Sequence, residues 1–257
     1  MNQSRNRQLE GRVAAVTGSS SGIGKAVALE LAAHGARVVV HARKSQAAAE
    51  QTAEEIRSLG SDSLVLLQDL QDPAAHEELV ERAWNWQGKI DAWVNNAGAD
   101  LLTGEAADWS FDRKLRRLLD VDVTATIRVA RLIGARMKQR GSGVILNMGW
   151  DQAATGMAGD SGELFAAAKG AVAAFSKSLA LSLAPEVRVN CLAPGWIQTA
   201  WGDNASDQWQ QRAVNESALG RWGTPQDVAG VACFLASPGA SFVTGQTIPV
   251  NGGWKAS

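Results

Sequence analysis

The sequence contains no tyrosine, although ten tryptophans and five phenylalanines occur among its 257 residues. No side chain can therefore supply a phenolic hydroxyl as a proton donor or acceptor. Cysteine is almost as rare, with only Cys191 and Cys233. Two cysteines are too few for a disulfide framework, and both fall within apolar segments. We therefore expect reduced, buried thiols, one on a strand and one on a helix.

Further absences narrow the class of protein. No stretch of about 18 apolar residues occurs, which argues against a membrane-spanning helix. The chain starts with MNQSRNRQLEGR, which is too polar for a signal peptide. The formal net charge is only −1, which disfavours a nucleic-acid or membrane partner. Because no Pro/Gly/Ser-rich linker divides the chain, we expect one cytoplasmic domain spanning residues 1–257, with residues 1–8 flexible.

The strongest local signal is the stretch VAAVTGSSSGIG at residues 13–24. Val13–Val16 predict a buried strand, a glycine turn follows, and a helix begins at Gly22. This layout directs backbone N–H groups and a positive helix end at a pyrophosphate. Gly18 would make the tight turn, Gly22 would let the backbone approach the phosphates, and Gly24 would let helix and strand pack closely. Glycines also end strands without binding any ligand, so the motif alone leaves that alternative open.

Four motifs occur in a fixed order along the chain. They are TGSSSGIG at 17–24, NNAG at 95–98, a helix that carries Lys169, and PG at 194–195. Together they resemble the short-chain dehydrogenase/reductase family over residues 9–253, with a pattern similar to its 3-oxoacyl-carrier-protein reductase and glucose dehydrogenase-like group. The resemblance implies an α/β fold with a single doubly wound, parallel, seven-stranded Rossmann-type sheet and helices on both faces. It also implies NAD(H) or NADP(H) as the cofactor.

Hydrophobic periodicity places the remaining elements between these motifs. After the first strand, strands are predicted at residues 36–41, 63–67, 90–94, 143–148 and 187–192, with a seventh within 244–253. After the first helix, helices are predicted at residues 46–59, 73–86, 111–139 and 163–184, with another that ends at 235.

The residues after the second predicted strand bear on the choice of cofactor. In this fold that position meets the adenosine ribose, and a basic residue there attracts a 2′-phosphate. Arg43 and Lys44 therefore favour NADP(H), with NAD(H) as the alternative, although both could instead be solvated loop charges. Asp69 and Leu70 occupy the place where the family holds adenine. Asp69 could instead cap the helix that begins at Pro73.

The resemblance assigns further cofactor contacts to strand ends and loops. Residues 95–98 would brace the sheet near the nicotinamide ribose, and Ile197 and Thr199 would meet the carboxamide. The complete predicted set is Gly18, Ser20, Ser21, Gly22, Ile23, Gly24, Arg43, Lys44, Asp69, Leu70, Asn96, Ala97, Gly98, Met148, Lys169, Pro194, Gly195, Ile197 and Thr199.

The family's catalytic Y-x-x-x-K motif appears here with Phe165 before Lys169. The four-residue spacing puts both side chains on one helical face. In the family, the lysine holds the nicotinamide ribose, and the tyrosine hydroxyl passes the proton that accompanies hydride transfer. Phe165 has the aromatic ring but lacks the hydroxyl group that would carry this proton. Another acid, such as a carboxyl group held protonated by burial, could replace it, and the candidates nearby in sequence are Asp151, Asp160, Ser161 and Glu163.

Two more positions depart from the family's pattern. Trp150 matches the serine that hydrogen-bonds the substrate carbonyl, and an indole N–H can donate but cannot accept a hydrogen bond. The loop could instead be shifted, so that Asp151 or Gln152 reaches inward. Asp122 stands where the family usually has an asparagine whose backbone carbonyl holds a water of the proton relay. We expect no metal ion at this site.

Two surfaces suggest a lid and an oligomer. The polar segment 200–218 carries Trp209 and is predicted to be a mobile substrate lid, or alternatively a surface helix whose tryptophans pack against the body. The predicted helices 111–139 and 163–184 are apolar on more than one face. In the family they pair across a two-fold axis, which predicts a homodimer or homotetramer.

Two functions fit these observations. The first is an NADP(H)-dependent oxidoreductase that acts on a small-molecule carbonyl or alcohol through an altered proton relay. The second is an NADP(H)-binding protein without turnover, with a sensing or structural role. A positioned acid or base contributes about 10²–10⁴ in rate, whereas holding two reactants together supplies about 7–11 kcal/mol. Slow reduction could therefore survive the loss of the hydroxyl, and we favour the first function.

Overall fold

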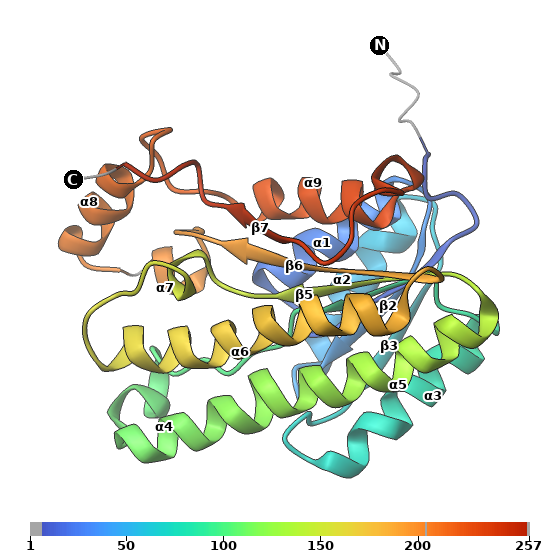
Figure 1. Cartoon of the computed structure of the whole chain (residues 1–257), viewed down its shortest axis with the longest axis horizontal. Coiled ribbons are helices and arrows are strands. Elements are labelled where there is room, and N and C mark those ends of the chain that lie inside the picture. The colour runs from blue at the N-terminus through green and yellow to red at the C-terminus, as the bar shows by residue number, and fades with distance from the viewer. Residues whose placement is uncertain (1–6, 204, 256–257) are drawn as a thin grey trace.

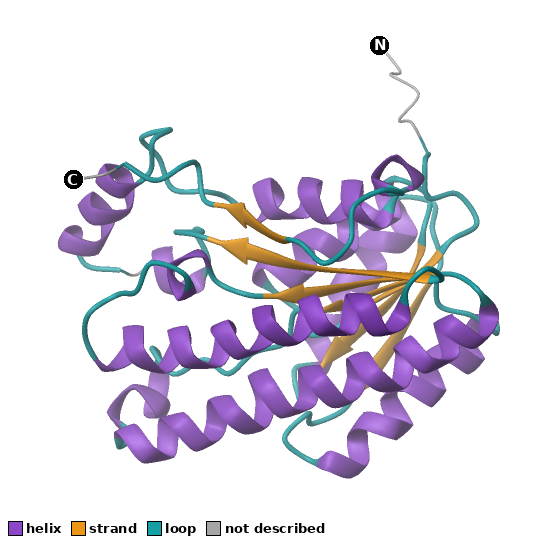
Figure 2. Cartoon of the chain, in the orientation of Figure 1, coloured by secondary structure: helices purple, strands orange, loops and turns teal. Residues whose placement is uncertain are grey.

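The computed structural model describes residues 7–203 and 205–255, so residues 1–6 of the segment predicted to be flexible lie outside the described residues. Within the described ranges, one parallel sheet has the strand order β3-β2-β1-β4-β5-β6-β7 (Figures 1 and 2). Its strands are β1 (Val13–Val16), β2 (Arg37–Ala42), β3 (Ser63–Leu67), β4 (Ala92–Asn95), β5 (Gly143–Met148), β6 (Val187–Pro194) and β7 (Thr247–Val250). The predicted doubly wound seven-stranded sheet is confirmed.

Helices cover both faces of this sheet (Figure 1). One face carries α1 (Gly22–Ala33), α2 (Gln46–Ser58) and α9 (Pro225–Ala236), and α1 contacts both of the others. The other face carries α3 (Pro73–Gln87), α5 (Ala125–Arg140) and α6 (Asp160–Leu183). The shorter helices α4 (Phe111–Leu118), α7 (Ala200–Asp203) and α8 (Asp207–Glu216) lie at the strand ends.

The two helical layers enclose separate apolar cores because side chains alternate across a strand. Along β1, Ala14 and Val16 belong to the core beneath α1, whereas Val13 and Ala15 belong to the core beneath α5. The thiols of Cys191 on β6 and Cys233 on α9 are buried and free, as predicted.

Several element boundaries differ from the prediction. The helix predicted at 111–139 is divided into α4 and α5 by a π-helical segment, Leu119–Thr124. Helix α6 begins at Asp160 instead of 163, because Gly159 adopts a φ of 93° and Asp160 places a carboxylate in the first turn. Strand β6 extends to Pro194, which pairs with Val250 on the edge strand β7. Periodicity alone does not reveal these local features.

Helix α6 is, among the described residues, the one helix long and apolar enough to span a membrane by length and composition. In the fold it packs against β6 and α5, and its residues Leu179, Ala180 and Leu183 enter the core. On another side of the helix Leu181 is 83% exposed. The predicted pairing of this helix between subunits stays a prediction.

Candidate active site

A cleft of about 890 Å³ opens where β1, β2 and β4 end. It gathers segments that are distant in the sequence, as expected at the carboxyl edge of a doubly wound sheet. The predicted site residues that line it are Gly18, Ser20, Ser21, Ile23, Arg43, Asp69, Leu70, Asn96, Ala97, Gly98, Asp122, Phe165, Lys169 and Thr199. Most of the sequence-predicted site therefore converges on one cleft.

The glycine turn has the shape that a close-fitting phosphate site requires. Gly18 has a φ of +64°, and a Cβ atom there would lie 2.8 Å from Cα of Ala97. At Gly24, which does not line the cleft, a Cβ atom would lie 2.2 Å from the backbone oxygen of Gly18. Gly22, also outside the lining, has a φ of +55°. These three glycines shape the turn, and the helix α1 N-terminus that follows it can face an anion.

His41, at the end of β2, supports this turn and was not predicted to do so. The backbone N–H of Gly18 donates a hydrogen bond to Nδ1 of His41 at 3.1 Å. Because Nδ1 accepts, Nε2 carries the ring proton and donates it to the Gln68 carbonyl at 3.0 Å. Burial lowers the pKa of His41 from 6.5 to about 4, so the imidazole stays neutral. The sequence signal that could have indicated this role is a histidine near the end of an otherwise apolar strand.

The NNAG motif is tied to the same turn through Thr17. The Thr17 hydroxyl accepts hydrogen bonds from the backbone N–H groups of Asn96 and Ala97, both at 3.0 Å. The side-chain amide of Asn96 donates to the backbone carbonyls of Thr17 and Gly18, both at 3.1 Å. The predicted brace between β1 and the β4 loop is therefore present.

A buried polar chain extends this brace across the sheet. The indole N–H of Trp93 donates to Oδ1 of Asn95 at 2.8 Å, and Nδ2 of Asn95 donates to Oδ1 of Asn147 at 2.8 Å. Asn147 in turn donates to the Ser176 hydroxyl at 2.9 Å. Each polar group in this chain has a partner, as burial requires.

At the adenosine end, only one of the two predicted basic residues lines the cleft. Arg43 does, whereas Lys44 lies outside the lining, and both residues are exposed; a cofactor contact by Lys44 stays a prediction. Asp69 lines the cleft and accepts a hydrogen bond from the Gln71 N–H at 3.0 Å. The cap of α3 is Asp72, which accepts from Ala74 at 2.9 Å. The alternative role of Asp69 as the helix cap is therefore wrong.

At the other end of the cleft, Lys169 forms an ion pair that the sequence did not predict. Its Nζ lies 2.8 Å from Oδ2 of Asp122, and the two side chains are 13% and 2% exposed. Oδ1 of Asp122 accepts a hydrogen bond from the Ala99 N–H at 2.8 Å. A Cβ atom at Gly98 would lie 2.9 Å from Oδ2, so glycine leaves room for the carboxylate. Phe165 lines the cleft one helical turn before Lys169.

The two positions where the family carries hydroxyl groups hold a pair of aromatic rings. The Trp150 and Phe165 ring centroids are 6.3 Å apart with an interplanar angle of 67°. This edge-to-face geometry is a favourable arrangement for aromatic rings. Trp150 does not itself line the cleft; it supports Phe165 from the side.

Asp151, the predicted replacement acid, also lies outside the cleft lining. Its Oδ2 accepts a hydrogen bond from Asn251 at 3.0 Å, and its Oδ1 accepts one from the N–H of Gln152 at 2.8 Å. Burial raises the pKa of Asp151, but the carboxyl faces the β7 loop instead of Phe165. Asp160 and Glu163 are exposed on the first turn of α6. The structure therefore gives none of these three carboxylates a place beside the cleft.

The loop after β6 approaches the glycine turn from the opposite side of the cleft. Thr199 lines the cleft, and its Cγ2 lies 3.8 Å from the position of a Cβ atom at Gly22. Ile197 is buried and pairs with Gly223 instead of lining the cleft. The other predicted contacts that lie outside the lining are Met148, Pro194 and Gly195. Met148 and Pro194 are buried, and Gly195 is half-buried.

The segment predicted as a lid is anchored by tryptophans. The ring centroids of Trp209 on α8 and Trp196 are 5.5 Å apart, and those of Trp196 and Trp222 are 6.0 Å apart. The indole N–H of Trp196 also donates to Glu216 at 2.7 Å. These contacts match the alternative of a surface helix packed against the body. A lid motion of residues 200–218 stays a prediction.

The cleft suits an elongated dinucleotide. Its glycine turn leaves no space for side chains at Gly18 and Gly24, its α1 end offers backbone N–H groups, and its lining includes both Arg43 and Lys169. A small compact ligand would leave most of the 890 Å³ empty.

Comparisons with known proteins agree with this geometry. A family model described as Enoyl-(Acyl carrier protein) reductase matches residues 18–255. The 3-oxoacyl-(acyl-carrier-protein) reductase FabG of Escherichia coli is 34% identical over 251 residues, covering 95% of this chain and 97% of that protein. A 7α-hydroxysteroid dehydrogenase solved with NADH and 7-oxo glycochenodeoxycholic acid is 32% identical, with a TM-score of 0.88 and coverage of 100% and 99%. A short-chain dehydrogenase from Burkholderia cenocepacia in complex with NADP is 31% identical, with a TM-score of 0.85 and coverage of 96% and 98%.

These relatives are named as reductases or dehydrogenases, and two of them hold a nicotinamide nucleotide. They favour an oxidoreductase over a protein that binds the cofactor without turnover. The family match covers most of the chain, and the resemblance first drawn from four motifs is confirmed. The chain belongs to the short-chain dehydrogenase/reductase family, whose solved members include complexes with NADH and with NADP.

Proposed function

We propose that this protein is an NADP(H)-dependent oxidoreductase that reduces the carbonyl group of a small molecule without a tyrosine in its proton relay. The observation that carries the proposal is the position of Lys169. This lysine is nearly buried, lines the same cleft as the glycine turn, and lies one helical turn from Phe165.

The chain's own residues would hold the dinucleotide along the cleft. Backbone N–H groups of the glycine turn and of the start of α1 would bind the pyrophosphate. Arg43 would bind a 2′-phosphate through charge-assisted hydrogen bonds, which is our reason for proposing NADP(H). Lys169 would hold the nicotinamide ribose. The bound nicotinamide supplies the hydride that reduces the carbonyl carbon.

The carbonyl oxygen must gain a proton as the hydride arrives, and Phe165 has none to give. Lys169 is the ionisable group nearest to Phe165 along this face of α6, and its ammonium has three N–H donors. Asp122 opposes this transfer, because giving up the proton breaks the ion pair with a buried carboxylate 2.8 Å away. We therefore expect turnover to be slow, with Lys169 as the proton donor and solvent in the cleft as its source of new protons.

The aromatic pair also bears on the substrate. Phe165 presents a ring where the family presents a hydroxyl, and Trp150 packs edge-to-face against that ring. A ring wall favours an apolar or aromatic group next to the substrate carbonyl, because burying apolar surface is the main gain available there. We expect aryl ketones and aldehydes to react faster than polar hydroxyketones.

The test measures NADPH oxidation with a panel of ketones and aldehydes, and NADPH binding by fluorescence. The panel is applied to the wild type, to Lys169→Met, to Phe165→Tyr and to Phe165→Tyr/Trp150→Ser. Asp151→Asn tests the alternative acid. We expect slow wild-type turnover that Lys169→Met abolishes and Asp151→Asn leaves nearly unchanged. Restoring the tyrosine should raise kcat, by up to about 10²–10⁴ if the family's relay is completed.

The other outcomes are equally informative. A silent wild type that binds NADPH, combined with an active double variant, would establish a cofactor-binding protein without turnover. Loss of activity in Asp151→Asn but not in Lys169→Met would identify Asp151 as the proton donor in place of Lys169. Absence of NADPH binding would refute both the reductase and the binding protein.

A further inference from the structure

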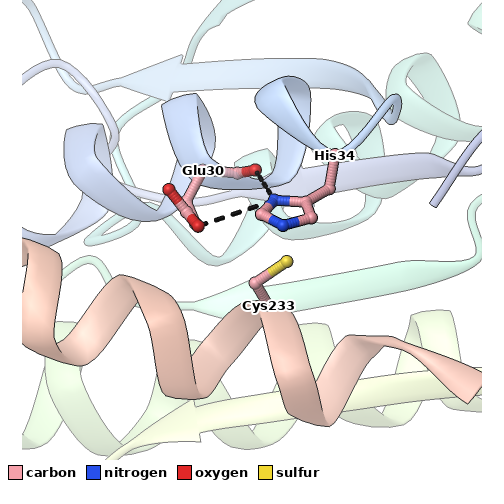
Figure 3. Close-up of side chains that lie close together, drawn as sticks. All are labelled: Glu30, His34 and Cys233. Atoms are coloured by element: carbon pink, nitrogen blue, oxygen red, sulfur yellow. Dashed lines mark hydrogen bonds and ion pairs between the residues drawn. The ribbon is translucent and has the colours of Figure 1, made fainter. Parts of the chain in front are cut away.

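Three metal-ligating side chains meet between α1 and α9, away from the cleft (Figure 3). Glu30 and His34 are one helical turn apart at the end of α1, and Cys233 projects from α9. Their ligand atoms all lie within 4.8 Å of one another. Cys233 is 2% exposed, whereas the Glu30 and His34 side chains are 38% and 22% exposed. The cluster therefore has a buried sulfur and a route to solvent.

The hydrogen bonds of His34 leave one ring nitrogen available to a metal. Nδ1 lies 2.9 Å from the backbone carbonyl oxygen of Glu30. A carbonyl oxygen can only accept, so Nδ1 carries the proton and Nε2 keeps its lone pair. In Figure 3, Nε2 faces the Cys233 sulfur. A carbonyl that holds Nδ1–H is also the usual second partner of a metal-bound histidine.

We propose that Glu30, His34 and Cys233 form a Zn²⁺ site, with water as the fourth ligand. Thiolate, imidazole and carboxylate are the three ligand types that Zn²⁺ takes in tetrahedral sites. A sulfur ligand disfavours the hard cations Mg²⁺ and Ca²⁺.

The distances permit this coordination after a small closure. Zn–S bonds of about 2.3 Å and Zn–N or Zn–O bonds of about 2.0–2.2 Å put tetrahedral ligand atoms about 3.3–3.6 Å apart. The present spread of at most 4.8 Å thus has to close by about 1 Å. The Glu30 carboxylate now lies 3.5 Å from Nδ1, and rotation of this partly exposed side chain toward Nε2 can supply most of the movement.

Binding must displace the proton of the Cys233 thiol. Burial, assisted by the nearby Glu30 carboxylate, raises the pKa of Cys233 to about 12, so the thiol is protonated in the absence of metal. When Zn²⁺ forms its bond to sulfur, that proton is released to solvent and no electron is transferred. A protonated thiol is also a poor nucleophile, which argues against Cys233 as a reactive cysteine.

The ion would join two helices that are far apart in the sequence. It would lie at the end of α1 opposite the glycine turn, about 18 Å along the helix. Its role would therefore be to clamp α1 to α9, with no direct part in hydride transfer.

The experiment uses the full chain after removal of metals with a chelator. Zn²⁺ bound after dialysis is counted by mass spectrometry, and Co²⁺ is added as a spectroscopic probe of sulfur ligation. The variants are Cys233→Ser, His34→Asn and, as a matched control, Cys191→Ser, which removes the other buried thiol. His34→Asn keeps an N–H near the Glu30 carbonyl while removing the ligand nitrogen. NADPH binding reports whether each variant is folded.

We expect one equivalent of Zn²⁺, a thiolate-to-cobalt charge-transfer band, and a thermal midpoint that Zn²⁺ raises but Mg²⁺ does not. Cys233→Ser should lose the band, His34→Asn should weaken binding at least ten-fold, and Cys191→Ser should change neither. Absence of the band in the wild type would overturn the proposal. So would a band that survives in Cys233→Ser or disappears in Cys191→Ser.

Discussion

Acidification should destabilise the fold through His41, because this side chain stays uncharged in the folded chain. Its Nε2–H donates to Gln68 and its Nδ1 accepts from Gly18, so a further proton can bind only at Nδ1, where it breaks the hydrogen bond from Gly18. Burial lowers the pKa from 6.5 to about 4, although Gln68 and the Asp69 carboxylate partly oppose this. Between these two values the unfolded chain binds a proton that the folded chain does not. Stability is therefore complete above pH 6.5 and is lost as the pH falls toward 4.

The size of the effect follows from the pKa difference. Each pKa unit corresponds to about 1.36 kcal/mol, so lowering the pKa from 6.5 to about 4 removes about 3 kcal/mol once both states are protonated. About 2 kcal/mol of this loss should already be present near pH 5. A typical domain has only about 5–15 kcal/mol of stability, so this single group should matter.

The assay is urea unfolding of the wild type and of His41→Asn at pH 8 and at pH 5. Asparagine can still accept a hydrogen bond from the Gly18 N–H but does not titrate, so its cost at pH 8 should persist unchanged at pH 5. Carboxylates titrate in both proteins and cancel in the comparison. We expect the wild type to lose about 2 kcal/mol more than the variant on this change of pH. Equal losses in the two proteins would refute the assignment of a neutral, buried His41.

Three further predictions concern the cleft and its supports. Arg43→Leu should weaken NADPH binding about ten-fold or more and leave NADH binding unchanged, because charge-assisted hydrogen bonds are worth about 1.5–3 kcal/mol. Fluorescence titration measures both affinities, and equal weakening of both would contradict a 2′-phosphate contact. Gly24→Ala places a Cβ atom 2.2 Å from the Gly18 oxygen, and should therefore abolish NADPH binding and lower the thermal midpoint. Asn147→Ala leaves the buried Nδ2 of Asn95 without its acceptor and should cost about 1–3 kcal/mol in urea unfolding; a neutral result would mean that a water replaces the amide.

The parts of the site that the sequence predicted depend on local backbone geometry. The turn from β1 into α1 needs glycine at Gly18 and Gly24 because neighbouring backbone atoms lie within 3 Å of any added Cβ atom. Such a requirement is visible in the sequence as a spacing of glycines. The same holds for the four-residue spacing that puts Phe165 and Lys169 on one face of α6. Fold class and one end of the cleft follow from signals of this kind.

The parts that the sequence did not predict depend on contacts between distant segments. Lys44 and Arg43 are adjacent basic residues after the same strand, and only the backbone direction at the end of β2 decides which one lines the cleft. Asp151 follows Trp150 directly, yet its carboxyl faces Asn251, 100 residues later in the chain. Cys233 likewise lies about 200 residues after Glu30 and His34, and meets them only because α1 packs on α9. The spacing of residues within one segment cannot predict contacts between distant segments.

The ion pair of Lys169 shows why two departures from the family should be considered together. Taken singly, Asp122 in place of asparagine is a mild change, and Phe165 in place of tyrosine removes a proton donor. In the fold, the Asp122 carboxylate lies 2.8 Å from the lysine, and the lysine is only 13% exposed. A cation so poorly solvated needs a negative partner or strong hydrogen bonds, and a phenyl ring supplies no hydroxyl to solvate it. Asp122 provides that partner, and Gly98 leaves the room for it. The two substitutions therefore form one electrostatic arrangement, in which a carboxylate 2.8 Å away pairs with the lysine although Phe165 offers no hydroxyl.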